Sequence, residues 1–453
     1  MSSSTDVIGR VRAPRQRPGR DPFVDLLRTF SMLAVVLGHW IMPMLAYAKG
    51  TITVGDSLAT PGWWMLTWVM QVMPVFFAVG GAANFHSYSA HLAAGGDARG
   101  WLATRLYRLT VPVLPLLGVW LVAPPVLTAL GLPAQPVGFA AGIVGQLLWF
   151  LAVYLLTVAL APLMIRARDR FGLAVPVVLV AAAALVDVAR FAGMPMIGYL
   201  NEAFVWLAVQ QLGIEYAAGR FARLSTSAAA LVGLAGFGAT ALLVVAGPYP
   251  ASMVGLPGQA VSNMSPATLC LVTLGIGQLG LLLAVRRRIV ALGRRPRIAA
   301  LQDLVGPRCM TVYLWHMSAM IVVAGVAVLG FGYATPAAGT LGWLLVTPLW
   351  VGALALVLRG LLVAFARFET IRASIRRGPS APRLVGALVL LAAGLLDIAA
   401  RGFVIPSGQG PVAALLLGPI PAIAAILGSL AFTRTARSAA QRSEAQQRGR
   451  RLV

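Results

Sequence analysis

The sequence predicts an all-α membrane protein, a polytopic transmembrane bundle of about 12 helices with both termini in the cytoplasm. Hydrophobic residues make up 59% of the chain and charged residues only 11%, a balance typical of proteins embedded in lipid. Apolar segments long enough to cross a bilayer recur along the chain. When they cross alternately, all of the 36 lysines and arginines except Lys49, Arg190 and Arg401 fall on one side. The positive-inside rule identifies that side as the cytoplasm.

The elements are predicted in the following order. A polar, basic tail at residues 1–22 is expected to be disordered. The first apolar run, from Leu26 to about Tyr47, is too long for the core of a signal peptide and is predicted as the first helix. Further spans are predicted near residues 62–84, 109–130, 138–164, 172–189, 199–218, 226–246, 267–285, 310–329, 337–363, 384–400 and 411–432.

The charge of the connecting loops alternates as this order requires. Loops near 85–108, 165–171, 219–225, 286–309 and 364–383 are basic, whereas those near 131–137, 247–266 and 330–336 are almost uncharged. We therefore expect a membrane core of about ten spans at 23–383. Two additional helices at 384–432 and a basic cytoplasmic tail at 433–453 follow it.

The net charge of +23 would indicate nucleic-acid binding in a soluble protein. Here the arginines border apolar spans, so we expect anionic membrane lipids as partners and no nucleic acid. The two cysteines, Cys270 and Cys309, lie in or beside cytoplasmic-side helix ends and exclude both a disulfide framework and a cysteine-based metal site. Lys49 is the only lysine, a bias typical of a GC-rich bacterial genome, so the expected location is a bacterial plasma membrane.

The first helix carries Asp25, Arg28 and His39. Eleven residues at 100° each place His39 within about 20° of Arg28 on the same face, roughly 16 Å further along the axis. At the cytoplasmic end of the helix, the guanidinium of Arg28 is able to bind a phosphate. Near mid-membrane, His39 is expected to be neutral and able to take up a proton. A phosphorylated cytoplasmic donor with a long reactive arm would fit this spacing. The alternatives are a topological anchor for Arg28, a hydrogen-bonded core residue for His39, and for Asp25 either an ion pair with Arg28 or a favourable helix N-terminal charge.

Two further features precede the third span. Arg105 and Arg108 stand at i and i+3 and share a helix face, so they are able to clamp a phosphate together, although positive-inside bias alone also produces such pairs. Upstream, Gly80 and Gly81 allow close approach of either a neighbouring helix or a ligand.

Together these motifs resemble the acyltransferase-3 family of integral-membrane acyltransferases. The resemblance covers the first helix through the tenth span. It rests on Asp25, Arg28 and His39, the Phe-Phe-x-x-(Ser/Gly)-Gly stretch at 76–81, the Arg105/Arg108 pair, Leu-Trp-Phe-Leu at 148–151, and the Tyr-x-x-His element at Tyr313 and His316.

The resemblance implies transfer of an acyl group, commonly acetyl, from cytoplasmic acyl-coenzyme A to a hydroxyl of a glycan, lipid-linked sugar or small natural product. Acyl-coenzyme A is then a co-substrate, and no tightly bound cofactor is expected. It also implies a site in which Arg28, Arg105 and Arg108, with Gly80 and Gly81, bind the coenzyme. His39 is the expected catalytic base, with Asp25 and His316 in the same catalytic set; for His316, near the cytoplasmic end of the ninth span, a structural hydrogen bond stays an alternative.

The residues that would contact the acceptor are less clearly indicated than those that would bind the coenzyme. Trp149 in the fourth span and Asn201, Glu202 and Trp206 in the sixth are candidates, but interhelical hydrogen bonds would also explain the polar residues among them. Four histidines without paired carboxylates in one span give no metal site. The chain departs from many family members in having glycine at Gly80 where they have serine. Typical members have about ten spans and some add an extracellular hydrolase-like domain, whereas this chain is expected to add two plain C-terminal spans. Direct transfer to a small or membrane-near acceptor is therefore expected.

Two other functions fit a protein of about 12 spans. A secondary transporter or lipid flippase would have the same topology, but it should also show repeat symmetry and broken helices at matched positions. A catalytically inactive scaffold is the third alternative.

Overall fold

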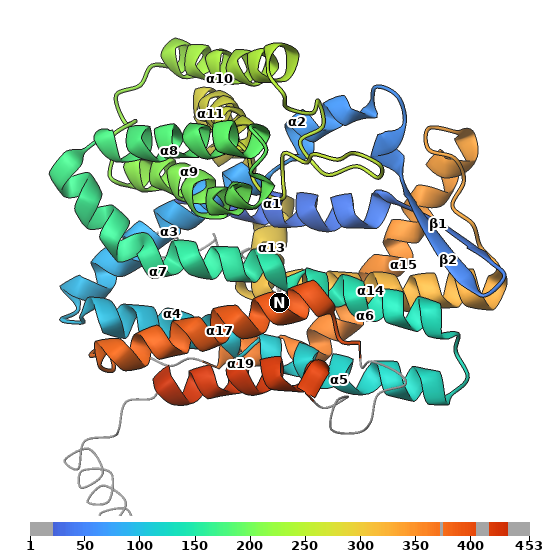
Figure 1. Cartoon of the computed structure of the whole chain (residues 1–453). Helices are drawn as coiled ribbons and strands as arrows, with labels where there is room; N and C mark the ends of the chain where they lie inside the picture. Colours follow the sequence, from blue (N-terminus) through green and yellow to red (C-terminus); the bar gives the residue numbers. More distant parts are fainter. Residues whose placement is uncertain (1–20, 372–374, 405–415, 434–453) are drawn as a thin grey trace, which may run out of the picture.

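The computed structural model describes residues 21–371, 375–404 and 416–433. It is a bundle of helices that run roughly alongside one another (Figure 1). The helices are α1 (Pro22–Ile41), α2 (Leu66–Met70), α3 (Met73–Ala93), α4 (Ala98–Thr110), α5 (Val113–Ala129), α6 (Ala134–Gln146), α7 (Leu148–Phe171), α8 (Ala174–Phe191), α9 (Asn201–Ala217), α10 (Thr226–Ala246), α11 (Leu269–Ala284), α12 (Arg286–Gly293), α13 (Pro296–Val305), α14 (Cys309–Ala324), α15 (Leu341–Phe365), α16 (Arg367–Thr370), α17 (Ala381–Arg401) and α19 (Ile420–Thr433).

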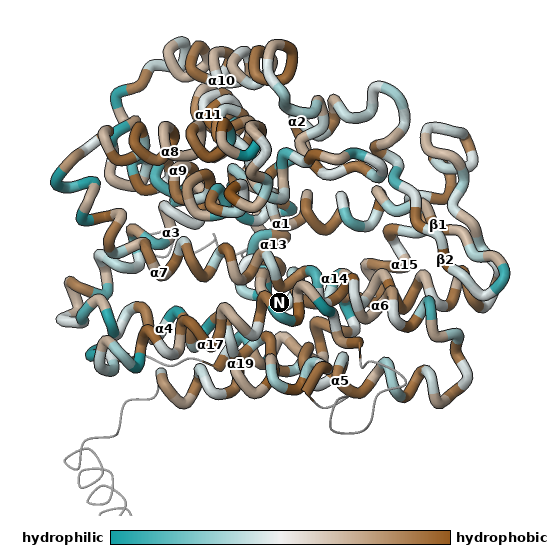
Figure 2. The backbone as a smooth tube through the Cα atoms, viewed as in Figure 1, coloured by the Kyte–Doolittle hydropathy of each residue, from teal (hydrophilic) through white to brown (hydrophobic). Residues whose placement is uncertain are grey.

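Short helical turns join several of these helices. They are η1 (Ser57–Ala59), η2 (Trp63–Met65), η3 (Pro195–Leu200), η4 (Gly306–Arg308) and the π-helical η5 (Gly325–Gly330) that extends α14. Figure 2 shows the long helices apolar over most of their length, with polar residues gathered mainly toward the turns.

Nine helical segments within the described residues are long and apolar enough to cross a membrane, and the count reaches 10 if α11 and α12, bent by 71°, form one broken span. The chain is therefore a multi-pass membrane protein, with fewer such segments than the 12 or so predicted. Among the predicted spans, α9 has 17 residues, α11 has 16 and α19 has 14. Part of the last predicted span and nearly all of the two tails lie outside the described residues.

The polar content of α9 explains why it differs from an ordinary span. Its residues Asn201, Gln210, Gln211 and Glu215 are all buried among other helices. A helix that carries so many polar side chains is stable in a membrane only when protein surrounds it. It is an interior helix of the bundle.

The first helix ends earlier than predicted, and the fold is not purely α-helical. α1 stops at Ile41, and β1 (Pro43–Ala48) pairs antiparallel with β2 (Thr51–Asp56). Pro43 cannot continue a helix, and it restricts the residue before it. Lys49 and Gly50 both have positive φ, at 50° and 79°, as a two-residue hairpin turn requires. A β-hairpin therefore replaces the expected end of the helix.

Two of the loops predicted on the outer side, near 131–137 and 330–336, contact the hairpin at one end of the bundle. Thr335 exchanges hydrogen bonds with Leu45 of β1, and Gln135 bonds to Ile52 of β2. The indole ring of Trp63 packs edge-on against Trp343, 5.5 Å between centroids. We call this the hairpin end. The loops at this end are almost uncharged, as the predicted alternation of basic and uncharged loops requires. The side of the membrane that the hairpin end faces stays a prediction.

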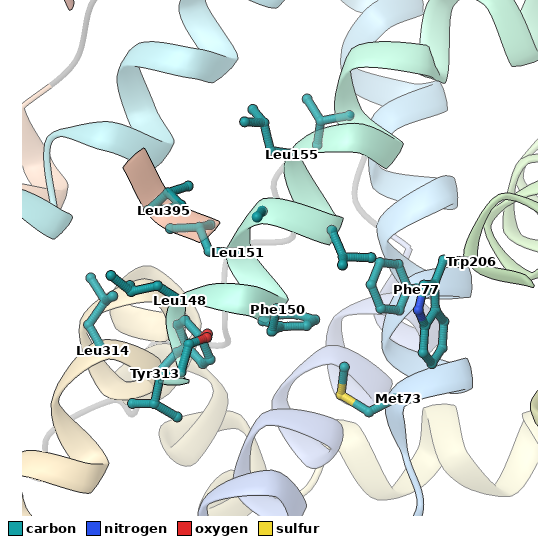
Figure 3. Close-up of a cluster of buried hydrophobic side chains, with 14 of the residues drawn as sticks. Met73, Phe77, Leu148, Phe150, Leu151, Leu155, Trp206, Tyr313, Leu314 and Leu395 are labelled. Carbon is teal, nitrogen blue, oxygen red and sulfur yellow. The ribbon is translucent and has the colours of Figure 1, made fainter. Parts of the chain in front are cut away.

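The core is centred on α7. Phe150 of α7 lies between Tyr313 of α14 and Phe77 of α3, at 5.2 Å and 5.6 Å between ring centroids (Figure 3). Phe77 in turn stacks on Trp206 of α9, at 4.4 Å. This row of aromatic rings links four helices, and it fixes α14 relative to α3 and α7.

Glycines allow α3 and α9 to approach each other closely. A methyl group added at Gly213 of α9 would lie 1.7 Å from the carbonyl oxygen of Ala78 on α3, and one added at Gly81 would lie 2.1 Å from that of Gln210. The backbones of α3 and α9 are therefore in direct contact. Of the two additional C-terminal helices, α17 packs against α6 and α7, where a methyl group at Gly145 would lie 2.6 Å from the carbonyl oxygen of Ile398.

Candidate active site

Two histidines 277 residues apart lie in contact. Nδ1 of His39 is 2.8 Å from Nε2 of His316, and the two rings are nearly coplanar, with 13° between their planes. The contact forms because α1 and α14 pack against each other. His316 is fully buried, while His39 is partly exposed.

The position of His39 along its helix differs from the prediction. His39 lies in the last turn of α1, because the helix ends at Ile41, whereas a longer helix was expected to place it near mid-membrane. His316 was expected near the cytoplasmic end of its span, but the structure brings it to the level of His39. Both histidines thus lie toward the hairpin end of α1.

The second histidine is held on several sides. Its Nδ1 lies 2.6 Å from the carbonyl oxygen of Tyr313, and its own carbonyl accepts a hydrogen bond of 3.0 Å from Nε1 of Trp40. The Tyr313 hydroxyl donates to the carbonyl of Leu147, the residue that precedes α7. Trp350 of α15 donates to the carbonyl of Trp40 at 3.1 Å. The pair is therefore fixed by contacts among four helices.

The other end of α1 carries Asp25 and Arg28. Nη2 of Arg28 lies 3.2 Å from Oδ1 of Asp25, the ion pair that the sequence indicated as one alternative. Nε of Arg28 is buried without a hydrogen-bond partner. The guanidinium is oriented by Asp25 and still has a donor to offer to an anion.

Arg105 and Arg108 lie close to Arg28. The charges of Arg28 and Arg108 both act on Arg105. Arg105 donates to Oγ of Ser87 on α3, and its guanidinium lies 5.4 Å from the ring centroid of Trp101. The three predicted arginines thus converge from α1 and α4. Three neighbouring positive charges create a field that favours a multiply charged anion.

Glu369 of α16 joins this region to the start of α14. Its carboxylate accepts hydrogen bonds from the backbone N–H groups of Met310 and Thr311, at 3.1 Å and 3.0 Å, and lies near Arg108. Burial raises the pKa of the Glu369 carboxyl above its ordinary value, although these hydrogen bonds and Arg108 act in the opposite direction. Glu369 caps the helix that carries His316.

Two polar groups that sequence reasoning did not select lie in this part of the bundle. Ser31 of α1 and Asn84 of α3 are both fully buried, and Oγ of Ser31 and both amide atoms of Asn84 have no hydrogen-bond partner. Buried polar groups are almost always paired, by protein, water or ligand. A polar residue inside an apolar run is the signal that would have identified them.

Asn84 shares a helix face with Gly80 and Ser87. Gly80, four residues earlier, faces the ring of Tyr154, and Ser87, three residues later, holds Arg105. Positions i, i+4 and i+7 lie on one side of a helix. Gly81 instead faces α9. The structure thus gives both predicted glycines a helix-packing role, and a ligand contact at either stays a prediction.

The predicted acceptor residues make contacts within the protein. Nδ2 of Asn201 donates to Oδ1 of Asp187 at 2.8 Å, and Glu202 accepts from Nε1 of Trp206 at 2.9 Å and from the N–H of Ala267 at 3.1 Å. Trp149 packs edge-on against its neighbour Phe150 and stays partly exposed. Contact of Trp149, Asn201, Glu202 and Trp206 with an acceptor stays a prediction.

An aromatic cavity opens beside the histidine pair at the hairpin end. Its walls include Trp40, Tyr333, Trp343 and Trp350 together with Thr335 and Thr347. Because Trp40 follows His39 directly in the chain, the cavity adjoins the pair. Within the described residues, no group of three or more histidine, cysteine or acidic side chains is arranged to hold a metal ion.

Comparison with known proteins gives one match. A family model described as an acyltransferase domain, the acyltransferase-3 model, matches residues 21–358. No curated protein and no solved structure matches the chain.

Proposed function

The chain belongs to the acyltransferase-3 family and is a membrane acyltransferase, and from this we propose that it moves an acyl group, in the first instance acetyl, from cytoplasmic acyl-coenzyme A to a hydroxyl group of an acceptor. His39 acts as the general base. Asp25 orients Arg28, and Arg28, Arg105 and Arg108 bind the phosphates of the coenzyme.

The observation that carries this proposal is the contact between His39 and His316 at the far end of the helix that bears Arg28. A rise of 1.5 Å per residue separates Arg28 from His39 by about 16 Å along α1. A donor that binds by its phosphates at Arg28 must therefore reach inward with a long arm, as the pantetheine arm of coenzyme A does. One end of α1 thus supplies phosphate binding at Arg28, and the other supplies the base, His39.

The unpaired groups between those ends fit the same donor. The pantetheine arm contains two amides, and each amide has one N–H donor and one carbonyl acceptor. The carboxamide of Asn84 and the hydroxyl of Ser31 are buried and unpaired, so they are able to exchange hydrogen bonds with such an arm without losing bonds inside the protein.

The reaction is balanced as follows. His39 takes the proton of the acceptor hydroxyl while the oxygen attacks the carbonyl carbon of the thioester. The bond between that carbon and sulfur then breaks, and the coenzyme leaves as a thiolate. The thiolate takes up the proton from His39, which restores the neutral imidazole.

The aromatic cavity beside Trp40 is the proposed entrance for the acceptor. Tryptophan and tyrosine rings offer flat apolar faces, and Thr335 and Thr347 add hydroxyl groups, a combination that suits a sugar ring. The acceptor would thus arrive from the hairpin end and the donor from the arginines. We propose a glycan, a lipid-linked sugar or a small natural product as the acceptor.

Purified protein in lipid nanodiscs, incubated with radiolabelled acetyl-coenzyme A, tests the proposal. The wild type should cleave the thioester and transfer the label to a hydroxyl acceptor, or slowly to water. His39→Gln should lower turnover by about 10²–10⁴-fold, because glutamine forms hydrogen bonds but cannot take the proton. His86→Gln, on the exposed side of α3, is the matched control and should keep full activity. An active His39→Gln variant would contradict the assignment, and a wild type that binds acetyl-coenzyme A without cleaving it would contradict the function.

A further inference from the structure

We infer that His316 is a positioning residue that determines which ring nitrogen of His39 carries the proton. His39 holds its hydrogen on Nδ1, directed at His316, and its Nε2 has the free electron pair that takes the proton of the acceptor. This inference rests on the proposed role of His39 as the base.

The carbonyl of Tyr313 determines which nitrogen of His316 carries the hydrogen. A backbone carbonyl oxygen only accepts hydrogen bonds, so the 2.6 Å contact requires Nδ1 of His316 to donate. A neutral imidazole has one N–H group, and its other nitrogen is an acceptor. Nε2 of His316 is therefore an acceptor. Across the 2.8 Å contact, Nδ1 of His39 must then be the donor.

A charged His316 could not accept a hydrogen bond from His39, because both of its ring nitrogens would be donors. The side chain is fully buried, and its ring nitrogens contact a carbonyl and another imidazole. In the described part of the chain no carboxylate forms an ion pair with it. A buried charge without a counter-charge is strongly unfavourable. The neutral form of His316 is the one that this environment supports.

The remaining contacts stop the carbonyl of Tyr313 from turning away. The Tyr313 ring packs against Phe150 at 5.2 Å, and its hydroxyl is bonded to the carbonyl of Leu147. Trp40 binds the carbonyl of His316, one turn further along α14. The direction of the whole series, from His39 to His316 to Tyr313, is thus set by a fixed backbone carbonyl. Carboxylates and carbonyls orient catalytic and metal-binding histidines in the same way.

The orientation matters for the reaction. If Nε2 of His39 carried the hydrogen, the nitrogen that faces away from His316 would be a donor and could not act as a base. In a Ser-His-Asp enzyme, loss of the residue that fixes the tautomer lowers turnover by about 10⁴-fold. A neutral partner should have a smaller effect, and we expect a loss of at least about tenfold.

A matched pair of variants tests the inference through turnover. The amide of glutamine reaches the position of Nε2, so His316→Gln keeps an oxygen that accepts from His39. The amide of asparagine reaches only the position of Nδ1, so His316→Asn keeps the contact with Tyr313 and leaves His39 without its acceptor. We expect the glutamine variant to keep kcat within a few-fold of wild type and the asparagine variant to lose at least about tenfold. KM for the donor should not change in either. Equal losses in both variants would overturn the inference and indicate a packing role.

A second measurement does not depend on activity or on the folding of the His316 variants. Nitrogen-15 NMR of the full-length protein, labelled at histidine, distinguishes protonated from unprotonated ring nitrogens, and His39→Gln identifies the His39 signals. The wild type should show a protonated Nδ1 and an unprotonated Nε2 on His39. A protonated Nε2 would overturn the inference. An active His39→Gln variant would instead overturn the role of His39 as the base, and a wild type that binds acetyl-coenzyme A without cleaving it would overturn the proposed function, whatever the NMR shows, so these failures are distinguishable from that of the inference.

Discussion

At the scale of single residues, α1 separates two kinds of chemistry along one face. Arg28 pairs with Asp25 in the first turns and keeps an unpaired Nε. His39 meets His316 in the last turn. The sequence predicted both residues, because charged and titratable groups are rare in apolar spans. It left the role of His316 open, since no local pattern specifies a partner 277 residues away.

Arg108 tests the donor site. Replacement by alanine removes one of three converging guanidiniums, each able to form charge-assisted hydrogen bonds worth about 1.5–3 kcal/mol. Arg108→Ala should therefore weaken coenzyme A binding by roughly 10- to 100-fold, measured by calorimetry on the nanodisc-embedded protein. Arg99→Ala changes an arginine of the same helix whose side chain is 52% exposed, and it should leave affinity unchanged. If wild type and Arg108→Ala bound coenzyme A with equal affinity, these arginines would only set the orientation of the helices in the membrane.

A substitution at Asn84 should affect donor binding and protein stability in different ways. Its amide is buried and unpaired, so Asn84→Leu, which has a similar shape, removes an unfavourable burial and should keep or raise the unfolding temperature. If the amide binds the arm of the donor, the same change should raise KM for acyl-coenzyme A by about 2- to 10-fold, the value of one hydrogen bond. A lower unfolding temperature with unchanged KM would show that Asn84 has a structural partner.

At the scale of elements, the contact between α3 and α9 explains how polar residues are kept inside the bundle. Small residues at Gly81 and Gly213 let the two backbones touch. The aromatic row from Trp206 through Phe77 and Phe150 to Tyr313 continues this contact to α14 (Figure 3). Positions in α3 and α9 are therefore linked to the helix that carries His316.

Gly213 tests this contact. The methyl group of Gly213→Ala would lie 1.7 Å from the carbonyl oxygen of Ala78, so the helices must separate. Overpacking of this kind costs about 1–3 kcal/mol, and we expect a lower unfolding temperature and a loss of acyl transfer. Gly238→Ala in α10 has no atom within 4 Å of the new methyl group and should be neutral or slightly stabilising. A Gly213→Ala protein as stable as the Gly238→Ala control would disprove the contact.

At the scale of the whole molecule, loops of one predicted side gather at one end of the bundle. Leu45 and Ile52 contact Thr335 and Gln135 in the predicted loops near 330–336 and 131–137, and Trp63 packs against Trp343 at the start of α15. The three converging arginines lie toward the other end of α1. This division agrees with a membrane protein that takes its two substrates from opposite sides.

Cysteine labelling tests the orientation. In a background without Cys270 and Cys309, Gln259→Cys in the loop at 247–266 should react with a membrane-impermeant thiol reagent in intact cells. Arg288→Cys on α12 should react only after permeabilisation, because its loop is basic and stays inside. Both sites are exposed in the structure, so accessibility within the protein does not limit the reaction. The reverse pattern would invert the membrane orientation and place the arginines on the outer face.

The sequence by itself determined that the chain is a membrane protein and where most of its spans lie. It also identified Arg28, Arg105 and Arg108 as candidates for one phosphate-binding site. These depend on local quantities, since the free energy of moving a segment into lipid and the cost of translocating its charged loops follow from composition. Only the tertiary structure decided that Pro43 begins a hairpin, that α9 is an interior helix and that His316 binds His39. The hairpin is local, but the long apolar run from Leu26 concealed the end of the helix before Pro43. The other two depend on packing between segments far apart in the chain, and no stretch of the sequence alone specifies which surfaces will meet.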